Sequence, residues 1–287
     1  MNDKRLLLLN DIKLSYCDIN NCQLDIIDNI SFSLHENEII SLIGPSGCGK
    51  SSLLRIISGE EKKYNGICDC NFTNSENNMC DCGFLYQDAA CFDWMTVKQN
   101  VEFGLKMRKM SKKEREVIAK KYIDSVGLSG FENYYPGDLS GGMKQRVALA
   151  RVLVLNPKLL LMDEPFAALD AMLRKKMQQL TMKLCKKYGQ SIIFVTHDID
   201  EAITVADRIY VLSKRPTQVL KEIKVPNRLK EVDGYENDFE FNKLKMEIMS
   251  YMDEQTEVYK KCIAENCCKV TGSIGQSKEN FIHDQSV

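Results

Sequence analysis

Four features that would assign the protein to a particular class are missing from its sequence. No apolar run approaches the roughly 18 residues that a membrane-spanning helix requires, since stretches such as Leu6–Leu9 and Leu159–Met162 are short. No basic excess is present, because the formal net charge is -1, so the protein is not expected to bind nucleic acid. No signal peptide is recognisable and no internal repeat is visible. We therefore expect a single unit that stays in the cytosol.

Cysteine, by contrast, is abundant, with 12 residues in a chain of 287. In a cytosolic protein of this length the thiols are expected to be free. Cys68, Cys70, Cys80 and Cys82 form two Cys-x-Cys motifs on an expected hairpin over residues 66–83. If the motifs lie on paired strands, each places two thiols on one face, and four thiolates suit zinc. The other interpretation is reduced cysteines on an exposed hairpin, which is favoured because zinc knuckles usually have Cys-x-x-Cys spacing.

The hydrophobic pattern of the chain predicts an α/β fold. Residues 5–43 are predicted to form strands separated by turns, and Glu38–Ile43 has the continuous apolar pattern of a strand covered on both faces. Residues 94–135 are helical in character, with a capping box that begins at Ser111. After residue 140 helices and strands alternate, which indicates a parallel sheet with helices on its faces. The elements expected there are helix 141–155, strand 159–162, helix 171–187, strand 191–196, helix 199–205 and strand 208–212.

A glycine-rich motif, Gly44-x-x-x-x-Gly49-Lys50-Ser51, directly follows the strand that ends at Ile43. This spacing is typical of a P-loop, in which backbone N–H groups converge on phosphate oxygens at the positive N-terminus of a helix. Lys50 would supply charge for the β- and γ-phosphates, and the hydroxyl of Ser51 would ligate Mg²⁺. A structural turn is the alternative. The residues expected to bind the nucleotide are Gly44, Pro45, Ser46, Gly47, Cys48, Gly49, Lys50, Ser51 and Ser52.

A second apolar strand ends in two carboxylates, Asp163 and Glu164. Ligands bind at the carboxyl edge of a parallel sheet, so both acids are expected beside the phosphates. Asp163 would hold Mg²⁺, directly or through water, and Glu164 would orient or deprotonate the attacking water. Buried strands often end in an acidic turn, and it is the accompanying P-loop that favours the catalytic interpretation.

The third motif is residues 139–145, Leu-Ser-Gly-Gly-Met-Lys-Gln. Ser140, Gly141 and Gly142 lie at the start of an expected helix, where they form a second anion-binding site. The motif resembles the signature sequence of ABC-type ATPases. One chain would then present two phosphate-binding surfaces for one nucleotide. Both surfaces are used if two copies pair head-to-tail, so that the signature of each copy closes over the ATP of the other. A helix N-cap after a loop is the alternative.

Four further positions match the same family one residue at a time. Gln87 resembles the Q-loop glutamine, which contacts Mg²⁺ and the attacking water. His197 resembles the switch histidine, which hydrogen-bonds the γ-phosphate. Asp170 lies in a stretch similar to the D-loop along the dimer seam, and Tyr16 resembles the aromatic side chain that stacks on adenine. For Tyr16 and His197 the alternative is an ordinary packing or surface residue.

The resemblance covers roughly residues 5–225. It implies a P-loop NTPase fold, with a RecA-like core, an N-terminal antiparallel β element and an inserted helical subdomain at about 88–150. These parts would form an ATP-binding domain over residues 1–225. The extension over 226–287 is expected to be helical at 238–263 and disordered after that.

Within the family, residues 93–97, 163–170 and 212–216 look like those of the ATPase subunits of nitrate, sulfonate and taurine importers. This resemblance implies an ATPase that uses ATP and Mg²⁺, pairs as a homodimer and docks on integral-membrane permease subunits, which a substrate-binding protein serves in turn. The subunit would lie peripherally on the cytoplasmic face of the membrane. An ABC exporter ATPase or a soluble ABC-type ATPase is the alternative.

Overall fold

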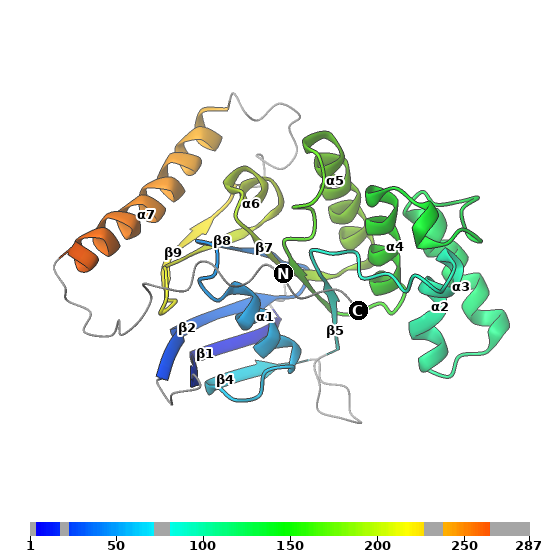
Figure 1. The fold of residues 1–287 in the computed structure, drawn as a ribbon, viewed down its shortest axis with the longest axis horizontal. Coiled ribbons are helices and arrows are strands. Elements are labelled where there is room, and N and C mark those ends of the chain that lie inside the picture. The colour runs from blue at the N-terminus through cyan, green and yellow to red at the C-terminus, as the bar shows by residue number, and fades with distance from the viewer. Residues whose placement is uncertain (1–3, 18–22, 72–80, 227–237, 265–287) are drawn as a thin grey trace, which may run out of the picture.

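The centre of the molecule is a six-stranded sheet with the strand order β5-β6-β7-β3-β8-β9 (Figure 1). The computed structural model describes residues 4–17, 23–71, 81–226 and 238–264. Neighbouring strands are parallel except β8 and β9. The α/β prediction is confirmed, and the antiparallel edge strand β9 is an addition to the expected elements. The strands are β3 (Ile39–Ile43), β5 (Cys82–Leu85), β6 (Leu159–Asp163), β7 (Ser191–Thr196), β8 (Arg208–Leu212) and β9 (Val219–Lys224).

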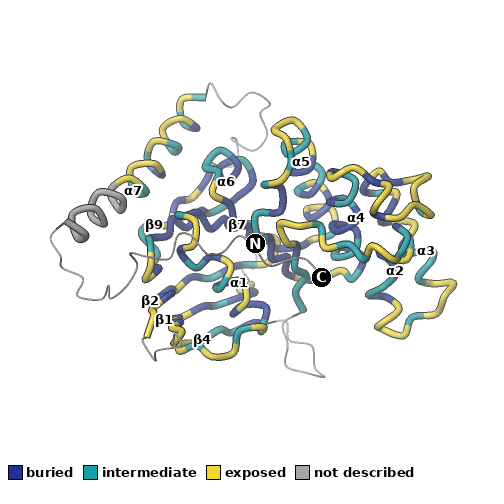
Figure 2. Tube along the Cα trace, viewed as in Figure 1, coloured by how far each residue is buried: buried dark blue, intermediate teal, exposed yellow. Residues whose placement is uncertain are grey.

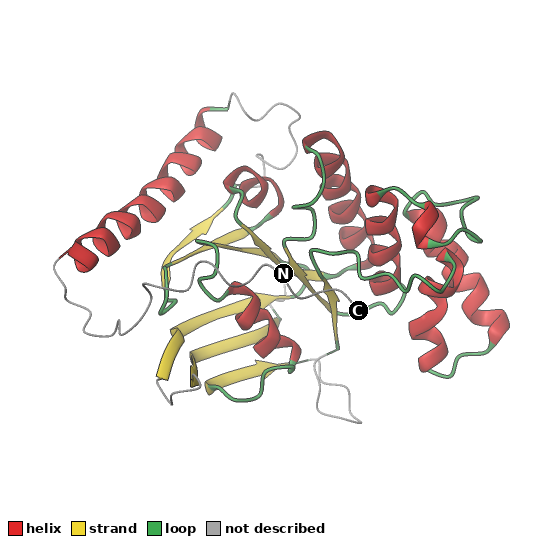
Figure 3. Ribbon diagram, viewed as in Figure 1, coloured by secondary structure: helices red, strands yellow, loops and turns green. Residues whose placement is uncertain are grey.

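A three-stranded antiparallel sheet with the order β2-β1-β4 forms the expected N-terminal β element (Figure 3). Its strands are β1 (Arg5–Cys17), β2 (Gln23–His35) and β4 (Asn65–Cys70). A parallel bridge between Ile27 of β2 and Thr217 joins this sheet to the loop that follows β8. The two sheets are therefore connected close to the end of a strand of the central sheet.

The expected cysteine-bearing hairpin over residues 66–83 is wrong. β4 pairs with β1 and β5 pairs with β6, so the two strands belong to different sheets. Cys68 and Cys82 pack, partly buried, against a hydrophobic cluster, and Cys80 lies outside the described residues. Among the residues that the structure describes, no three His, Cys, Asp or Glu side chains gather as metal ligands would. The paired-strand arrangement that the zinc interpretation required is not formed.

Helices cover both faces of the central sheet, and three of them form a group to one side of it (Figure 1). The capping box at Ser111 is confirmed, and a second one begins at Thr96. The region expected to be helical at 94–135 contains two helices, because the chain turns between Met107 and Lys112. The helices are α1 (Lys50–Ser58), α2 (Val97–Met107), α3 (Lys112–Ser125), α4 (Gly141–Leu153), α5 (Ala171–Tyr188), α6 (Ile199–Val205) and α7 (Phe239–Ala264), with a short 3-10 turn at Pro136–Asp138.

The central strands are buried on both faces, as their continuous apolar pattern predicts (Figure 2). Alternate side chains of β6 show how the sheet divides the core. Leu160 and Met162 belong to the cluster that contains residues of α2, α4, α5 and α6. Leu159 and Leu161 belong to the cluster that contains α1 and the antiparallel sheet. A strand of this kind has no solvent-facing side, so its only exposed chemistry is at its ends.

The C-terminal helix α7 packs against α6 and β8. Its side chains Phe241 and Ile248 are 1% and 0% exposed, and the ammonium group of Lys245 lies 2.7 Å from a carboxylate oxygen of Asp200 on α6. A helix is thus present where one was expected at 238–263. The division of the chain into a domain at 1–225 and an extension at 226–287 stays a prediction.

Gly83 on β5 lies in close contact with helix α4. A Cβ atom there would lie 2.2 Å from Cγ1 of Val152 and 3.0 Å from Cδ2 of Leu160. We expect Gly83→Ala to lower the free energy of unfolding by about 1–3 kcal/mol, the usual cost of overpacking, as measured by urea denaturation. The control is Gly137→Ala, since no atom lies within 4 Å of a Cβ at Gly137. Equal unfolding free energies for the two variants would contradict this account of the packing.

Candidate functional site

Three neighbouring strands of the central sheet deliver the residues expected to carry the chemistry. β6, β7 and β3 are adjacent in the sheet and parallel. Asp163 ends β6, His197 follows β7 and the loop 44–49 follows β3. Because the carboxyl ends of parallel strands lie at the same edge, residues up to 153 positions apart in the sequence meet there.

The loop 44–49 has the backbone conformation that its glycines were expected to allow. Gly47 and Gly49 have φ angles of 72° and 121°, a region that side-chain-bearing residues rarely adopt. Gly49 is the N-cap of α1, whose first turn has no side-chain cap and no acidic residue. Its N–H groups are therefore open to an anion, which the positive end of the helix favours.

Lys50 is the charged group of this loop and is only 5% exposed. Its Nζ donates hydrogen bonds to the carbonyl oxygens of Gly44 and Pro45 at 2.8 and 2.9 Å. A buried ammonium group must be hydrogen-bonded or paired, and the loop's own carbonyls do this here. The side chain thus curls back over the loop, which keeps its positive charge where phosphate oxygens would lie.

Asp163 lies next to this loop, as expected. Burial raises the pKa of Asp163, whereas a hydrogen bond with Ser51 and the positive charge of Lys50 act in the opposite direction. Glu164 lies beside it and raises the pKa further through its negative charge. A nearby cation stabilises the charged form of a carboxylate that burial disfavours. The hydrogen bond between Asp163 and Ser51 places a carboxylate oxygen and a hydroxyl oxygen side by side.

Glu164 and His197 form a direct pair. The Nδ1 atom of His197 lies 2.9 Å from Oε2 of Glu164, and the backbone N–H of Glu164 donates to the carbonyl of Val195 at 3.0 Å. Glu164 has a φ of 45°, a left-handed conformation that costs a side-chain-bearing residue on the order of 1–2 kcal/mol. Such local strain often accompanies functional positions. Here it turns the carboxylate toward the histidine.

Gln87 and Tyr16 lie around this centre. Gln87 is exposed and follows the edge strand β5, one strand beyond β6. Tyr16 is 39% exposed on β1; its hydroxyl donates to Glu61 at 3.0 Å and lies near Ser52 of α1. Tyr16 is therefore a surface side chain beside α1 rather than a core residue.

The signature residues are located on the helical side of the molecule. Ser140 caps α4, where its hydroxyl accepts a hydrogen bond from the N–H of Met143 at 3.3 Å. Gly142 is buried, and a Cβ there would lie 2.5 Å from Leu173 of α5. Asp170 caps α5 through the N–H of Leu173 at 3.0 Å. Capping is thus a shared structural role of Ser140 and Asp170, and their expected roles toward ATP stay predictions.

Two features of the site were not found from the sequence. The side chains of Arg215 and Thr217 donate hydrogen bonds to the P-loop carbonyls of Gly47 and Cys48. The stretch 212–216 was noted only for its resemblance to importer ATPases. Its partners lie about 170 positions earlier in the chain, so no local pattern could show the contact.

The second feature is a buried acid behind the histidine. Glu201 is 8% exposed and accepts hydrogen bonds from Gln178, at 2.6 Å, and from Thr196. Burial raises the pKa of Glu201, and these two bonds lower it. The hydroxyl of Thr196 also accepts from the N–H of Asp198, so this network fixes both backbone neighbours of His197.

Comparison with known proteins places the chain in one family. The profile of the family described as ABC transporter matches residues 27–167. An ABC transporter ATP-binding protein of Methanocaldococcus jannaschii is 43% identical over 208 residues, which are 72% of this chain and 78% of that protein. The taurine import ATP-binding protein TauB of Pelagibacter ubique is 40% identical over 208 residues, which again are 72% of this chain and 78% of that protein. The nitrate import ATP-binding protein NrtD of Synechocystis is 42% identical over 69% of this chain and 75% of that protein.

Solved structures agree with this assignment. A dimeric ATP-binding cassette in a post-hydrolysis state with ADP and Pi is 32% identical, with a TM-score of 0.66, and the match covers 77% of this chain and all of that one. In the described part of the chain, no helix has the length and apolar character needed to cross a membrane. The P-loop NTPase fold is thereby confirmed, and the chain belongs to the ABC transporter family as an ATP-binding, ATP-hydrolysing subunit.

Proposed function

We propose that this subunit energises an importer of a small solute such as nitrate, a sulfonate or taurine. The observation that carries the ATPase part is the Glu164–His197 pair at 2.9 Å, next to a P-loop with a buried lysine. Glu164 takes a proton from the attacking water, and His197 holds the carboxylate and the γ-phosphate. The import part rests on the similarity to taurine and nitrate import proteins.

Mg²⁺ fits the oxygen ligands that lie together at the sheet edge. The side chains of Ser51 and Asp163 are hydrogen-bonded, and hydroxyl and carboxylate oxygens are ligands that Mg²⁺ prefers. Gln87 supplies the third expected oxygen. When bound there, the ion would supply positive charge that offsets the negative charge of the phosphates.

ATP would join two copies head-to-tail, with Ser140, Gly141 and Gly142 of one copy closing over the P-loop of the other. Ser140 and Gly141 are exposed at the N-terminus of α4, an arrangement suited to an anion supplied from outside the chain. Dimers are also known among the similar structures, as in the ADP-bound cassette.

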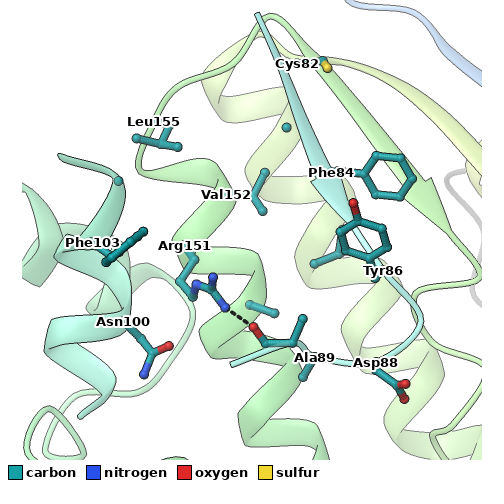
Figure 4. Close-up of a pocket in the computed structure, with 15 residues that line it drawn as sticks. Cys82, Phe84, Tyr86, Asp88, Ala89, Asn100, Phe103, Arg151, Val152 and Leu155 are labelled. Carbon is teal, nitrogen blue, oxygen red and sulfur yellow. Dashed lines mark hydrogen bonds between the residues drawn. The ribbon is translucent and has the colours of Figure 1, made fainter. Parts of the chain in front are cut away.

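The permease would dock at a pocket between the edge strand and the helical group (Figure 4). The pocket has a volume of about 250 Å³ and is lined by residues of β5, α2 and α4. Phe103, Val152 and Leu155 make it largely apolar, and Arg151, which also lines it, donates a hydrogen bond to the carbonyl of Ala90. A largely apolar pocket with one basic and one acidic lining residue, Arg151 and Asp88, suits a short amphipathic helix. A permease helix bound there would lie beside the segment that carries Gln87 and would hold the subunit on the cytoplasmic face of the membrane.

The dimer is tested by size-exclusion chromatography with light scattering. In a Glu164→Gln background with ATP and Mg²⁺ we expect a dimer. Adding Ser140→Ala should raise the dimer dissociation constant by roughly tenfold or more, the worth of a charge-assisted hydrogen bond. Ser111→Ala is the matched control, because Ser111 is also a serine N-cap but lies at the start of α3. A monomer in the Glu164→Gln background, or equal effects of the two serine changes, would contradict the head-to-tail dimer.

The import function is tested in proteoliposomes that contain the subunit, its permease and the substrate-binding protein. We expect ATP-dependent uptake of at least one of taurine, nitrate and an alkanesulfonate, with no uptake when the binding protein is omitted. Export in place of uptake would favour the ABC exporter ATPase. ATPase activity without any association with a permease would favour a soluble ABC-type ATPase.

A further inference from the structure

We infer that Arg215 and Thr217 are positioning residues for ATP binding, because they hold two peptide groups of the P-loop by their carbonyl oxygens. The inference rests on the proposed function, in which this loop grips the triphosphate. Among the residues that the structure describes, the side-chain hydrogen bonds of Arg215 and Thr217 go to the P-loop alone. Their effect on ATP would therefore pass through the backbone of Gly47, Cys48 and Gly49.

Thr217 makes the more deeply buried of the two contacts. It is 0% exposed, and its hydroxyl donates to the carbonyl oxygen of Cys48. The peptide unit is planar and trans, so its C=O and N–H point in opposite directions. Because Thr217 holds the carbonyl of Cys48 on its own side, the N–H of Gly49 points to the opposite side, away from Thr217.

Arg215 acts on the preceding peptide group. Its Nε donates to the carbonyl oxygen of Gly47, and a Cβ at Gly47 would lie 3.6 Å from its second guanidinium nitrogen. The guanidinium group thus lies next to the turn where the chain has a φ of 72°. This contact polarises the peptide group between Gly47 and Cys48 and brings a permanent positive charge to the phosphate-binding loop.

The loop that presents these side chains is itself fixed on two sides. Its ends are joined by a hydrogen bond from the N–H of Ser213 to the carbonyl of Gln218 at 3.0 Å. The N–H of Thr217 donates to the carbonyl of Ile26, and the N–H of Asp28 donates to the carbonyl of Thr217, both at 2.9 Å. The backbone position of Thr217 is therefore set by β2 and does not depend on its own hydroxyl.

This arrangement permits a clean substitution. Thr217→Val keeps the size and branching of the side chain and the two backbone bonds to β2, but removes the donor to Cys48. A buried carbonyl oxygen that is left without a donor costs its full desolvation penalty, because no other group replaces the lost hydrogen bond. We expect the KM for ATP to rise about tenfold, with kcat within about twofold of the wild type. Thr217→Ser should restore the wild-type KM.

Arg215→Gln should raise the KM for ATP by roughly fivefold, since an exposed charge-assisted bond is worth less than a buried one. Gln218→Ala is the matched control within the same loop, because the side chain of Gln218 bonds Asp28 and not the P-loop. Steady-state ATPase kinetics of the full chain give KM and kcat, and thermal unfolding without nucleotide reports on the fold.

The inference is overturned if Thr217→Val and Arg215→Gln keep the wild-type KM, or if they lower the unfolding temperature without nucleotide and Thr217→Ser fails to restore KM. It is supported if KM rises in both variants and not in Gln218→Ala. Lys50→Ala separates this inference from the proposed function. If Lys50→Ala binds ATP normally, the P-loop assignment itself fails. If Lys50→Ala loses ATP binding while Thr217→Val does not, only the positioning role of Arg215 and Thr217 fails.

Discussion

Replacing Glu164 with Gln is expected to lower ATP turnover on the order of 10²–10⁴-fold, the usual worth of a general base. ATP binding should be retained, because the P-loop, Lys50 and Asp163 are untouched. The carboxylate of Glu164 lies 2.9 Å from His197, and a glutamine side chain preserves this shape while losing the ability to accept a proton from water. Single-turnover hydrolysis of labelled ATP measures the chemical step directly.

A matched carboxylate away from the site provides the control for this result. Glu116→Gln removes an exposed ion pair with Lys98 on the helical side, 2.9 Å long, and should leave turnover within about twofold of the wild type, since exposed pairs contribute little. His197→Ala should resemble Glu164→Gln in direction. Near-normal turnover of Glu164→Gln would contradict the proposed role of Glu164 as general base and would leave the contact between Glu164 and His197 without a catalytic role.

Replacing Lys50 with Ala is expected to lower ATP affinity by roughly 10²-fold or more. The 5% exposed ammonium group donates two hydrogen bonds at the base of the loop, and charge-assisted bonds to phosphate are worth about 1.5–3 kcal/mol each. Isothermal titration calorimetry with a slowly hydrolysed ATP analogue gives the dissociation constant. Unchanged affinity would contradict the P-loop assignment.

The control for Lys50→Ala is a lysine of similar position in the chain but without a role in the site. Lys63 is exposed and lies after α1, so Lys63→Ala should bind the analogue with wild-type affinity. Because Lys50 is buried among the carbonyls of Gly44 and Pro45, its removal also leaves these acceptors unpaired. The apo variant should therefore be examined by thermal unfolding, so that a loss of affinity is not mistaken for a loss of fold.

Most of the fold follows from local patterns in the sequence. β3, β6 and β7 are continuous apolar runs, and such runs can be covered on both faces only in a parallel sheet with helices on each side. The site residues carried by their ends were predicted for the same reason, since Asp163, Glu164 and His197 each follow an apolar strand. Residue spacing in the P-loop was equally informative, because the motif itself encodes the backbone conformation.

The parts that the sequence did not predict depend on contacts between distant segments. β4 was interpreted as part of a hairpin with β5, although its actual partner, β1, lies about sixty residues earlier. β9 is a short edge strand with exposed Lys221 and Glu222, a pattern that suits either a strand or a loop. The bonds of Arg215 and Thr217 to the P-loop likewise join residues 168 and 169 positions apart. Patterns within a segment contain no information on such partners.

Gln87 differs from the other catalytic candidates in how its strand is anchored. β6, β7 and β3 each have a neighbour on both sides. In the described part of the chain, β5 is the outermost strand and pairs with β6 alone, through four residue pairs. A small displacement of this edge strand would move Gln87 without breaking the pairing of β3, the strand that precedes Lys50. In the proposed function, a docked permease would therefore act on Gln87 through a strand that is held on one side, whereas the P-loop follows β3, which is held on both sides.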